Sequence, residues 1–239
     1  ALARGTRVAF QAVGVYSSAP QWVVRSIAAL APKLACITVR DAASARLLRS
    51  WGVESPVVPD LSQAMSSAPS KRGRELLHTL GLKPRRPRVA LCLTATEPSL
   101  AKALLCSVPS LIDSLPEVQF AFVPMSHHPT MPRHNDLQFA RRLRSRAPRV
   151  AVLEDWLHPA DVLALLGHFP VVVCMRYHSL LFAARAGAAI VAIPYAEKCS
   201  SWLEEQGLDP VGTDAESLTE RIGQALWGTR SGAAGACTA

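Results

Sequence analysis

The sequence contains few aromatic and few charged residues for its length. Phe, Trp and Tyr make up 6% of the 239 residues and Asp, Glu, Lys and Arg 18%, whereas hydrophobic residues make up 49%. This composition excludes an intrinsically disordered chain and predicts a globular protein with a substantial core. The longest apolar runs, such as residues 169–175, fall far short of the ~20 residues that a membrane-spanning helix needs. Because the first residues lack both an initiator Met and the apolar stretch of a signal peptide, we expect a soluble chain whose start lies upstream.

Several signature motifs are also absent. The six cysteines form no Cys-x-x-Cys pair and show no regular spacing, so neither a disulfide framework nor a zinc site is predicted, and a reducing, cytoplasmic compartment fits best. The sequence has no P-loop, no Gly-x-Gly-x-x-Gly fingerprint and no Gly-x-Ser-x-Gly elbow. We therefore expect no bound cofactor and no metal.

The chain carries a formal charge of +8, which favours anionic partners. Much of the excess lies in residues 71–88 and 133–149. Neither cluster shows the alternation of basic and aromatic residues that stacks bases, so nucleic acid is not an expected partner. A solvated basic face is the favoured interpretation of both clusters, and attraction of phosphate is the alternative.

Strand-like apolar runs alternate with helical patterns, which predicts an α/β protein with mostly parallel sheets. We expect three strands within residues 1–61, which resembles half of a Rossmann-like domain, and five within residues 88–228, which is a complete one. Residues 62–87 have the Ser, Pro, Lys and Arg content of a linker. Residues 229–239 are expected to form a flexible tail.

The strongest local signal is a buried strand, 170–174, that runs directly into Arg176 and His178 before a helix begins near Ser179. In open parallel sheets, ligands bind outside the carboxyl ends of the strands, close to helix N-termini. An Arg offers a planar fork to a carboxylate or phosphate, and a His moves protons near neutral pH. The alternative, equally weighted, is that Arg176 pairs with a structural acid and His178 caps the helix.

Three further residues follow predicted strands and are candidates for the same sheet edges. Lys198 comes after strand 189–193, at a helix start where a cation is unfavourable unless an anion lies beside it. Arg40 follows strand 34–39, next to Asp41, which we expect to act as a helix N-cap. His127 follows strand 118–123 and is a candidate to line a substrate pocket.

Taken in order, these segments resemble the polysaccharide pyruvyl transferase family. The resemblance rests on an Arg-x-His turn followed by an Ala-rich helix, a Gly, a strand and Tyr-x-x-Lys, on an Arg-Asp-x-x-Ser element with a later Asp, and on a Pro-Met-Ser-His strand end. In this sequence these are Arg176-Tyr177-His178, Gly187, Tyr195 to Lys198, Arg40-Asp41 with Ser44 and Asp60, and Pro124 to His127. The family's Gly- and Asn-rich first βα element has no counterpart here.

The resemblance implies two Rossmann-like domains in a GT-B-like arrangement, with the N-terminal one incomplete. It implies transfer of a pyruvyl group from phosphoenolpyruvate to a sugar of a cell-surface polysaccharide or its lipid-linked precursor, at the inner face of the membrane, with formation of a ketal. By position, Arg40 and Arg176 would bind the phosphate and carboxylate of phosphoenolpyruvate. His178 would be the general acid/base, and Lys198 a further anion contact.

Two other functions stay open at this point. A nucleotide-sugar glycosyltransferase of the same architecture would use Glu197 to contact a ribose. A non-catalytic, truncated homologue would bind a saccharide or a partner without turnover.

Overall fold

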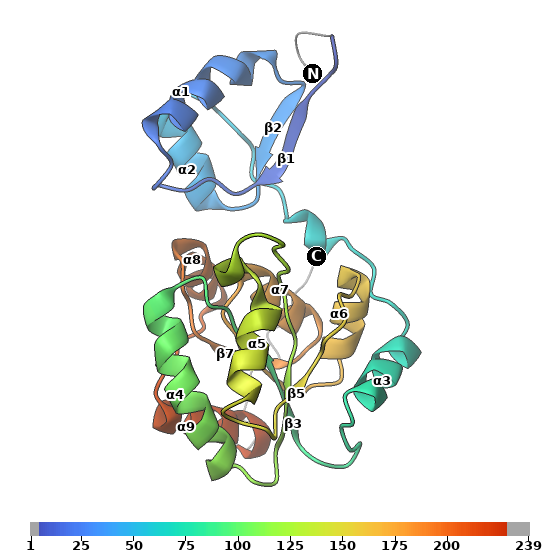
Figure 1. The fold of residues 1–239 in the computed structure, drawn as a ribbon. Helices are drawn as coiled ribbons and strands as arrows, with labels where there is room; N and C mark the ends of the chain where they lie inside the picture. Colours follow the sequence, from blue (N-terminus) through green and yellow to red (C-terminus); the bar gives the residue numbers. More distant parts are fainter. Residues whose placement is uncertain (1–4, 229–239) are drawn as a thin grey trace. The chain divides into compact units, whose positions relative to one another are not determined.

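The computed structural model describes residues 5–228. The chain divides into two compact units, Ala1–Met65 and Ser66–Ala239, each of which is an α/β structure (Figure 1). This division corrects one boundary, because residues 66–87, interpreted from sequence as part of a linker, belong to the second unit. The tail expected at residues 229–239 lies outside the described residues.

The first unit is a βαβ structure followed by one more helix. Its strands β1 and β2 are neighbours and parallel. The third strand expected in this unit is reduced to a single parallel bridge between Val39 and Val57. The elements are β1 Ala9–Val13, α1 Gln21–Leu30, η2 Ala31–Lys33, β2 Cys36–Val39, α2 Ala42–Ser50 and η3 Leu61–Gln63.

The core of the first unit is small. Its central cluster of buried apolar residues is Val39, Leu48 and Val53, and partly buried residues from the helices, strands and loops of the unit pack against it. Helix α2 ends at Ser50, and Gly52 follows with φ of 78°, a left-handed conformation that glycine adopts without steric cost.

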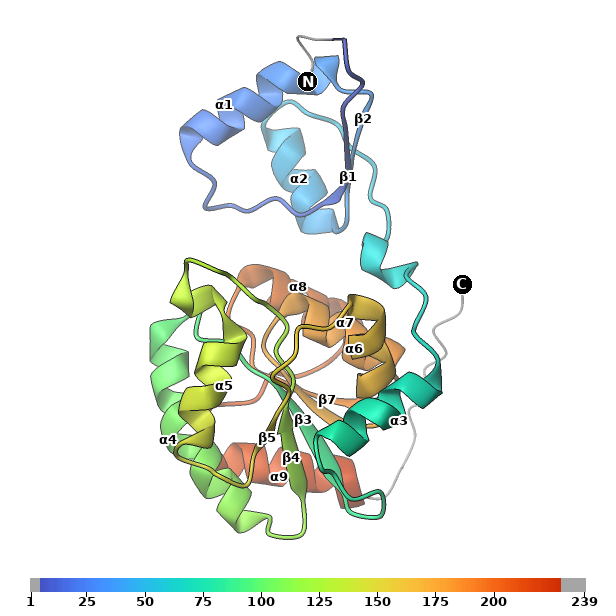
Figure 2. The same ribbon diagram turned by 45° about the vertical axis from the view of Figure 1, so that its right-hand side comes forward.

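The second unit is a five-stranded parallel sheet in the order β5-β4-β3-β6-β7. Helix α4 packs with α5 and α9 on one face, and α6 packs with α3 and α7 on the other (Figures 1 and 2). The strands are β3 Arg88–Cys92, β4 Gln119–Phe122, β5 Ala151–Val152, β6 Val171–Cys174 and β7 Ala189–Ala192. The helices are α3 Ser70–Thr79, α4 Pro98–Ser114, η4 Pro132–His134, α5 Asp136–Arg144, α6 Pro159–Leu166, α7 Tyr177–Arg185, α8 Glu197–Gln206 and α9 Ala215–Trp227.

Both faces of this sheet are covered, and its central strands are correspondingly apolar. All four residues of β6 are buried, and so are the last four of β3. Phe122 of β4 meets Phe139 of α5 edge to face, with ring centroids 6.2 Å apart, an arrangement that aromatic quadrupoles favour. Within residues 5–228, no helix is both long enough and apolar enough to cross a membrane.

Helix α3 explains why the linker prediction was wrong over residues 66–87. Its surface is basic, but Leu76 and Leu77 are buried, and α3 packs along α6. The Ala68 N–H donates to the carbonyl of Ala160 over 3.0 Å, just before the helix begins. At Gly73 a side chain would come within 2.4 Å of the Ala164 carbonyl oxygen, so the close approach of the two helices requires glycine there.

Candidate active site

The segment after β6 lies at the switch point of the second sheet. Chain order reverses between β3 and its neighbour β6, since β4 and β5 lie on one side of β3 and β6 and β7 on the other. Cα atoms of Cys92 and Cys174 are partners at the ends of these two strands. In doubly wound sheets this is where a crevice opens for ligands. Arg176 stands there as the N-cap residue of α7.

The guanidinium of Arg176 forms a bidentate ion pair with Asp136. Its Nε donates to Oδ2 and its Nη2 to Oδ1, each over 2.8 Å. Nη2 also donates to the hydroxyl of Thr94 over 2.9 Å. The Asp136 side chain is completely buried and that of Arg176 is 15% exposed. Planar, two-point pairing of this kind fixes a guanidinium more firmly than a single contact does.

Asp136 was not identified from the sequence. It is the first residue of α5, where a carboxylate also complements the helix dipole. Its Oδ2 accepts a further hydrogen bond from the Met125 N–H, over 3.2 Å, and its own N–H donates to the Ser126 carbonyl. Burial raises the pKa of Asp136, and the hydrogen bonds and charge of Arg176 act against that rise. The only sequence signal was a carboxylate at a helix start.

The structure agrees in part with the interpretation in which Arg176 pairs with a structural acid and His178 caps the helix. Arg176 does pair with an acid. His178 lies at the second position of α7, exposed, with its ring 5.7 Å from that of Tyr177 and 6.5 Å from that of Phe182. The hydroxyl of Ser179 donates to the Arg176 carbonyl over 2.6 Å, which ties the first turn of the helix to the arginine backbone.

Even so, Arg176 keeps part of its donor capacity. A guanidinium has five N–H groups. In the part of the chain that the structure describes, Nε and Nη2 donate to Asp136 and the threonines, and no hydrogen bond starts from Nη1. The result is a rigidly held cation at the sheet edge with an unused donor group.

Lys198 and His127 follow β7 and β4, at the same edge of the sheet. Lys198 is the second residue of α8 and half-buried. The thiol of Cys199 donates to the Met175 carbonyl over 3.3 Å, so the start of α8 is joined to the segment just before Arg176. His127 is exposed in the loop after β4, with its ring 5.7 Å from that of Trp156.

In the first unit, Arg40 follows β2 and is largely buried. Its Nη1 lies 3.3 Å from Oδ2 of Asp60, and its Nε lies 3.6 Å from Oδ2 of Asp41. Asp41 is the N-cap of α2, as expected, and accepts from the Ser44 N–H over 2.7 Å. The guanidinium also lies against Gly14, where a Cβ would be 2.4 Å from Nη2. The Arg-Asp-x-x-Ser element therefore organises the loop after β1.

Nucleophilic chemistry by two buried thiols is excluded. Burial raises the pKa of Cys174 to about 12 and that of Cys92 well above its usual value, so both stay protonated at neutral pH.

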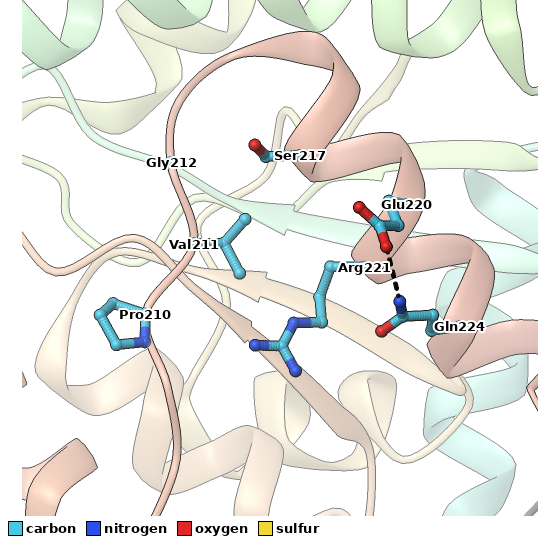
Figure 3. A pocket seen from close by; sticks show the side chains of 7 residues that line it. All are labelled: Pro210, Val211, Gly212, Ser217, Glu220, Arg221 and Gln224. Carbon is cyan, nitrogen blue, oxygen red and sulfur yellow. Dashed lines mark hydrogen bonds between the residues drawn. The ribbon is translucent and has the colours of Figure 1, made fainter.

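The second unit also has surface cavities away from Arg176. One of them, with a volume of about 370 Å³, lies between α9 and the segment before it, and Figure 3 shows the residues that line it. Arg221 extends from α9 toward this segment, and beside it Glu220 accepts a hydrogen bond from Gln224 over 3.0 Å. The lining residues are Pro210, Val211, Gly212, Ser217, Glu220, Arg221 and Gln224. Its mixed charge favours no ligand class.

Known structures share this fold. UDP-GlcNAc 2-epimerase from Neisseria meningitidis matches with a TM-score of 0.64 at 12% identity, over 93% of this chain and 62% of that one. The enzyme of the same name from Methanocaldococcus jannaschii matches with a TM-score of 0.62 at 13% identity, over 96% and 66%. Sucrose-phosphate synthase from Thermosynechococcus elongatus matches with a TM-score of 0.53 at 16% identity, over 90% and 55%.

These similarities define the class: the chain has a Rossmann-like, GT-B-like α/β fold, as predicted, and spans less than two thirds of the length of those structures. The family follows from the sequence itself. The family model described as polysaccharide pyruvyl transferase matches residues 1–197, and the chain belongs to that family. A comparison with curated protein sequences finds no match.

Proposed function

We propose that this chain carries out pyruvyl transfer from phosphoenolpyruvate to a sugar of a cell-surface polysaccharide or its lipid-linked precursor. The observation that supports this most directly is the Nη1 group of Arg176, which is unused within residues 5–228 while the rest of the guanidinium is fixed. Family membership supplies the reaction class. The proposal needs no cofactor, because phosphoenolpyruvate itself is the activated donor.

Arg176 is suited to bind an oxyanion of the donor. Because Asp136 neutralises much of the charge of Arg176, Arg176 would contribute to binding mainly through directed hydrogen bonds and less through its net charge. It offers two N–H groups at a fixed position, and no reorganisation is required when the ligand arrives. Lys198, the second residue of α8, would add a second positive charge. Arg40 of the first unit is proposed as the second arginine for the phosphate and carboxylate, and His127 as a residue of the saccharide pocket.

His178 is the proposed general acid/base. Ketal formation transfers one proton to the methylene carbon of phosphoenolpyruvate, removes one from each of two sugar hydroxyls, and releases phosphate, which takes the remaining proton. Histidine is the side chain most often used to donate and accept protons in catalysis near neutral pH. His178 is an exposed residue on the rigid first turn of α7, where substrate protons would be accessible to it.

The proposed partners follow from this chemistry. They are phosphoenolpyruvate and a saccharide acceptor, free or lipid-linked, and the proposed location is the cytoplasm, at the inner face of the membrane. Nucleic acid is not among them.

The test is calorimetric titration of phosphoenolpyruvate into wild-type protein and into Arg176→Lys and His178→Ala variants. Lysine keeps a charge beside Asp136 but loses the fork, so we expect binding weaker by at least ~10-fold, the value of about one charge-assisted hydrogen bond. His178→Ala should bind phosphoenolpyruvate and lose turnover. Arg144→Gln, which removes a charge from the exposed side of α5, is the control and should bind normally. Wild-type affinity in a folded Arg176→Lys variant would refute the assignment.

A nucleotide-sugar transferase is the second candidate, because two of the similar structures are of UDP-GlcNAc 2-epimerases, one of them bound to UDP-GlcNAc. In that case Glu197, exposed at the start of α8, would contact the ribose. A thermal-shift screen of UDP-GlcNAc against phosphoenolpyruvate separates the two candidates. A non-catalytic homologue would bind one of these ligands, or a saccharide, and show no turnover with any acceptor.

A further inference from the structure

A groove between α4 and α5 is lined by residues that have no role in the proposed reaction. It has a volume of about 330 Å³, at the small end of the range for ligand pockets. We call it the α4–α5 groove. It is lined by Ala95, Pro98, Ala101, Lys102, Leu105, Cys106, Arg133, Arg142 and Arg146.

All the charged side chains that line the α4–α5 groove are cationic: Lys102 from α4, Arg133 from η4, and Arg142 and Arg146 from α5 and the turn after it. The carboxylate nearest in sequence, Glu97, accepts hydrogen bonds from the backbone and hydroxyl of Ser99 instead. The cavity in Figure 3 differs, because Glu220 and Arg221 both line it.

The arginines near the end of α5 divide into two groups. Arg141 and Arg144 form ion pairs with Glu154, at 2.7 and 2.9 Å. Arg142 and Arg146 line the groove, and across residues 5–228 neither forms an ion pair. Arg146 donates to the Leu105 carbonyl over 3.2 Å, which fixes its position against α4. The uncompensated charge of residues 133–149 is therefore concentrated on the groove side.

The groove also has an apolar floor. Ala101 and Leu105 are buried and form part of the main core of the unit. The loop after β3 also lines it, and there Ala95 lies between the two threonines that bond to Arg176. In the same loop the hydroxyl of Thr96 donates to the Arg133 carbonyl over 3.4 Å. A ligand here would contact several cations, of which Arg146 is held in place, around an apolar surface.

We propose that the α4–α5 groove binds a phosphate or diphosphate group, carried on a molecule with a small apolar portion. Several cations around one site and no opposing carboxylate favour a multiply charged oxyanion over a carboxylate or a neutral sugar. The apolar floor favours an ester over the bare ion. The source is either a free phosphate ester or the headgroup of a lipid, and both present the same chemistry. This inference does not depend on pyruvyl transfer.

Cys106 provides a local probe. It is exposed and lines the groove, whereas Cys36, also exposed, lies in the first unit. We would measure alkylation rates of each cysteine peptide by mass spectrometry, in the full chain, with and without inorganic pyrophosphate. Sodium chloride of equal ionic strength is the control for screening. We expect pyrophosphate to slow alkylation of Cys106 several-fold and to leave Cys36 unchanged.

The matched variants are Lys102→Gln with Arg142→Gln, which removes two groove cations, and Arg144→Gln with Arg141→Gln, which removes two from the opposite side of α5. The first pair should raise the pyrophosphate concentration needed for protection by at least ~10-fold, and the second should not.

A parallel measurement uses phosphatidylcholine vesicles with and without phosphatidic acid. Protection by the acidic vesicles alone identifies a lipid headgroup as the source, and protection by pyrophosphate without protection by the acidic vesicles identifies a soluble phosphate compound. Protection by neither, equal protection by sodium chloride, or equal loss in both variant pairs would overturn the proposal.

Discussion

Each unit places an arginine after a parallel strand and pairs it with carboxylates, but the two pairs are built differently. In the second unit Arg176 meets the fully buried Asp136 through two contacts of 2.8 Å. In the first unit Arg40 approaches Asp60 at 3.3 Å and Asp41 at 3.6 Å. Both carboxylates there also cap helices. The stronger pair lies in the larger core, where misplacing a charge costs more.

The difference shows what each ion pair does. A buried ion pair contributes little net stability compared with a well-packed apolar pair, because both charges are desolvated. The Arg176 and Asp136 pair is therefore best understood as a device that fixes a guanidinium at the switch point of the sheet. Asp41 and Asp60 accept hydrogen bonds from backbone N–H groups as helix N-caps, whether or not Arg40 is present. The position of Arg176 therefore depends on Asp136, whereas the roles of Asp41 and Asp60 depend much less on Arg40.

Removal of Asp136 should have the largest effect. Asp136→Ala leaves the Arg176 guanidinium mostly buried without its counter-charge, and we expect a loss of about 3–5 kcal/mol in the second unit. Asp60→Ala should cost about 1–2 kcal/mol in the first unit, chiefly through the lost cap of η3. Hydrogen exchange of strand amides, read for each unit separately, measures both.

A double substitution makes the comparison sharper. Asp136→Leu with Arg176→Met replaces the buried pair by apolar side chains, and it should recover most of the stability lost in Asp136→Ala while abolishing binding of phosphoenolpyruvate. If Asp136→Ala and Asp60→Ala cost the same, the two pairs do not differ as their geometry indicates.

Two glycines allow a second comparison between the units. An added Cβ would come within 2.4 Å of a neighbour at both Gly14 and Gly73. At Gly73 that neighbour is the Ala164 carbonyl, and backbone cannot move without separating α3 from α6. Gly73→Ala should therefore cost about 1–3 kcal/mol, as overpacking does. At Gly14 the neighbour is the guanidinium of Arg40, the end of a flexible side chain.

Gly14→Ala should consequently cost less than about 1 kcal/mol, because Arg40 can adopt another rotamer. If Arg40 binds phosphoenolpyruvate, the same substitution should weaken calorimetric binding, whereas Gly73→Ala should not. Thermal unfolding and the same titration measure the two effects together. A Gly14→Ala variant as destabilised as Gly73→Ala would show that Arg40 is not free to move.

Much of the fold could be predicted from the sequence because periodicity is local. The bounds of α1, α8 and α9 agree with their apolar patterns, and the strand that delivers Arg176 was evident as a continuous apolar run. Short edge elements were less predictable: the edge strand β5 has only two residues, Ala151–Val152. Edge strands have one neighbour, so their length depends on the partner rather than on their own residues.

Of the ion pair at the candidate site, only Arg176 could be predicted from the sequence. The arginine stands out because an apolar strand ends in it. Its carboxylate partner lies 40 residues earlier, across two helices and two strands, and no spacing rule connects the two. Likewise, α3 was assigned to a linker because its basic surface conceals Leu76 and Leu77, which only packing against α6 reveals.

The smallest expected effect concerns one surface pair in each unit. Glu154 accepts from Arg141 and Arg144, and its side chain is 38% exposed; Glu54 meets Arg49 alone and is 75% exposed. The hydrogen bond from Arg141 is the main cause that lowers the pKa of Glu154. A carboxylate with a lowered pKa stabilises the fold above its unfolded pKa, and that stability disappears as the pH falls through the folded value.

Glu154→Gln should therefore cost about 0.5 kcal/mol near pH 7, reduced by solvent screening, and nothing at pH values where Glu154 is protonated. Glu54→Gln should have no measurable effect at either pH. Thermal unfolding at neutral and acidic pH, with and without added salt, tests this; a Glu154→Gln deficit that persists in acid would mean that the side chain acts through packing, not charge.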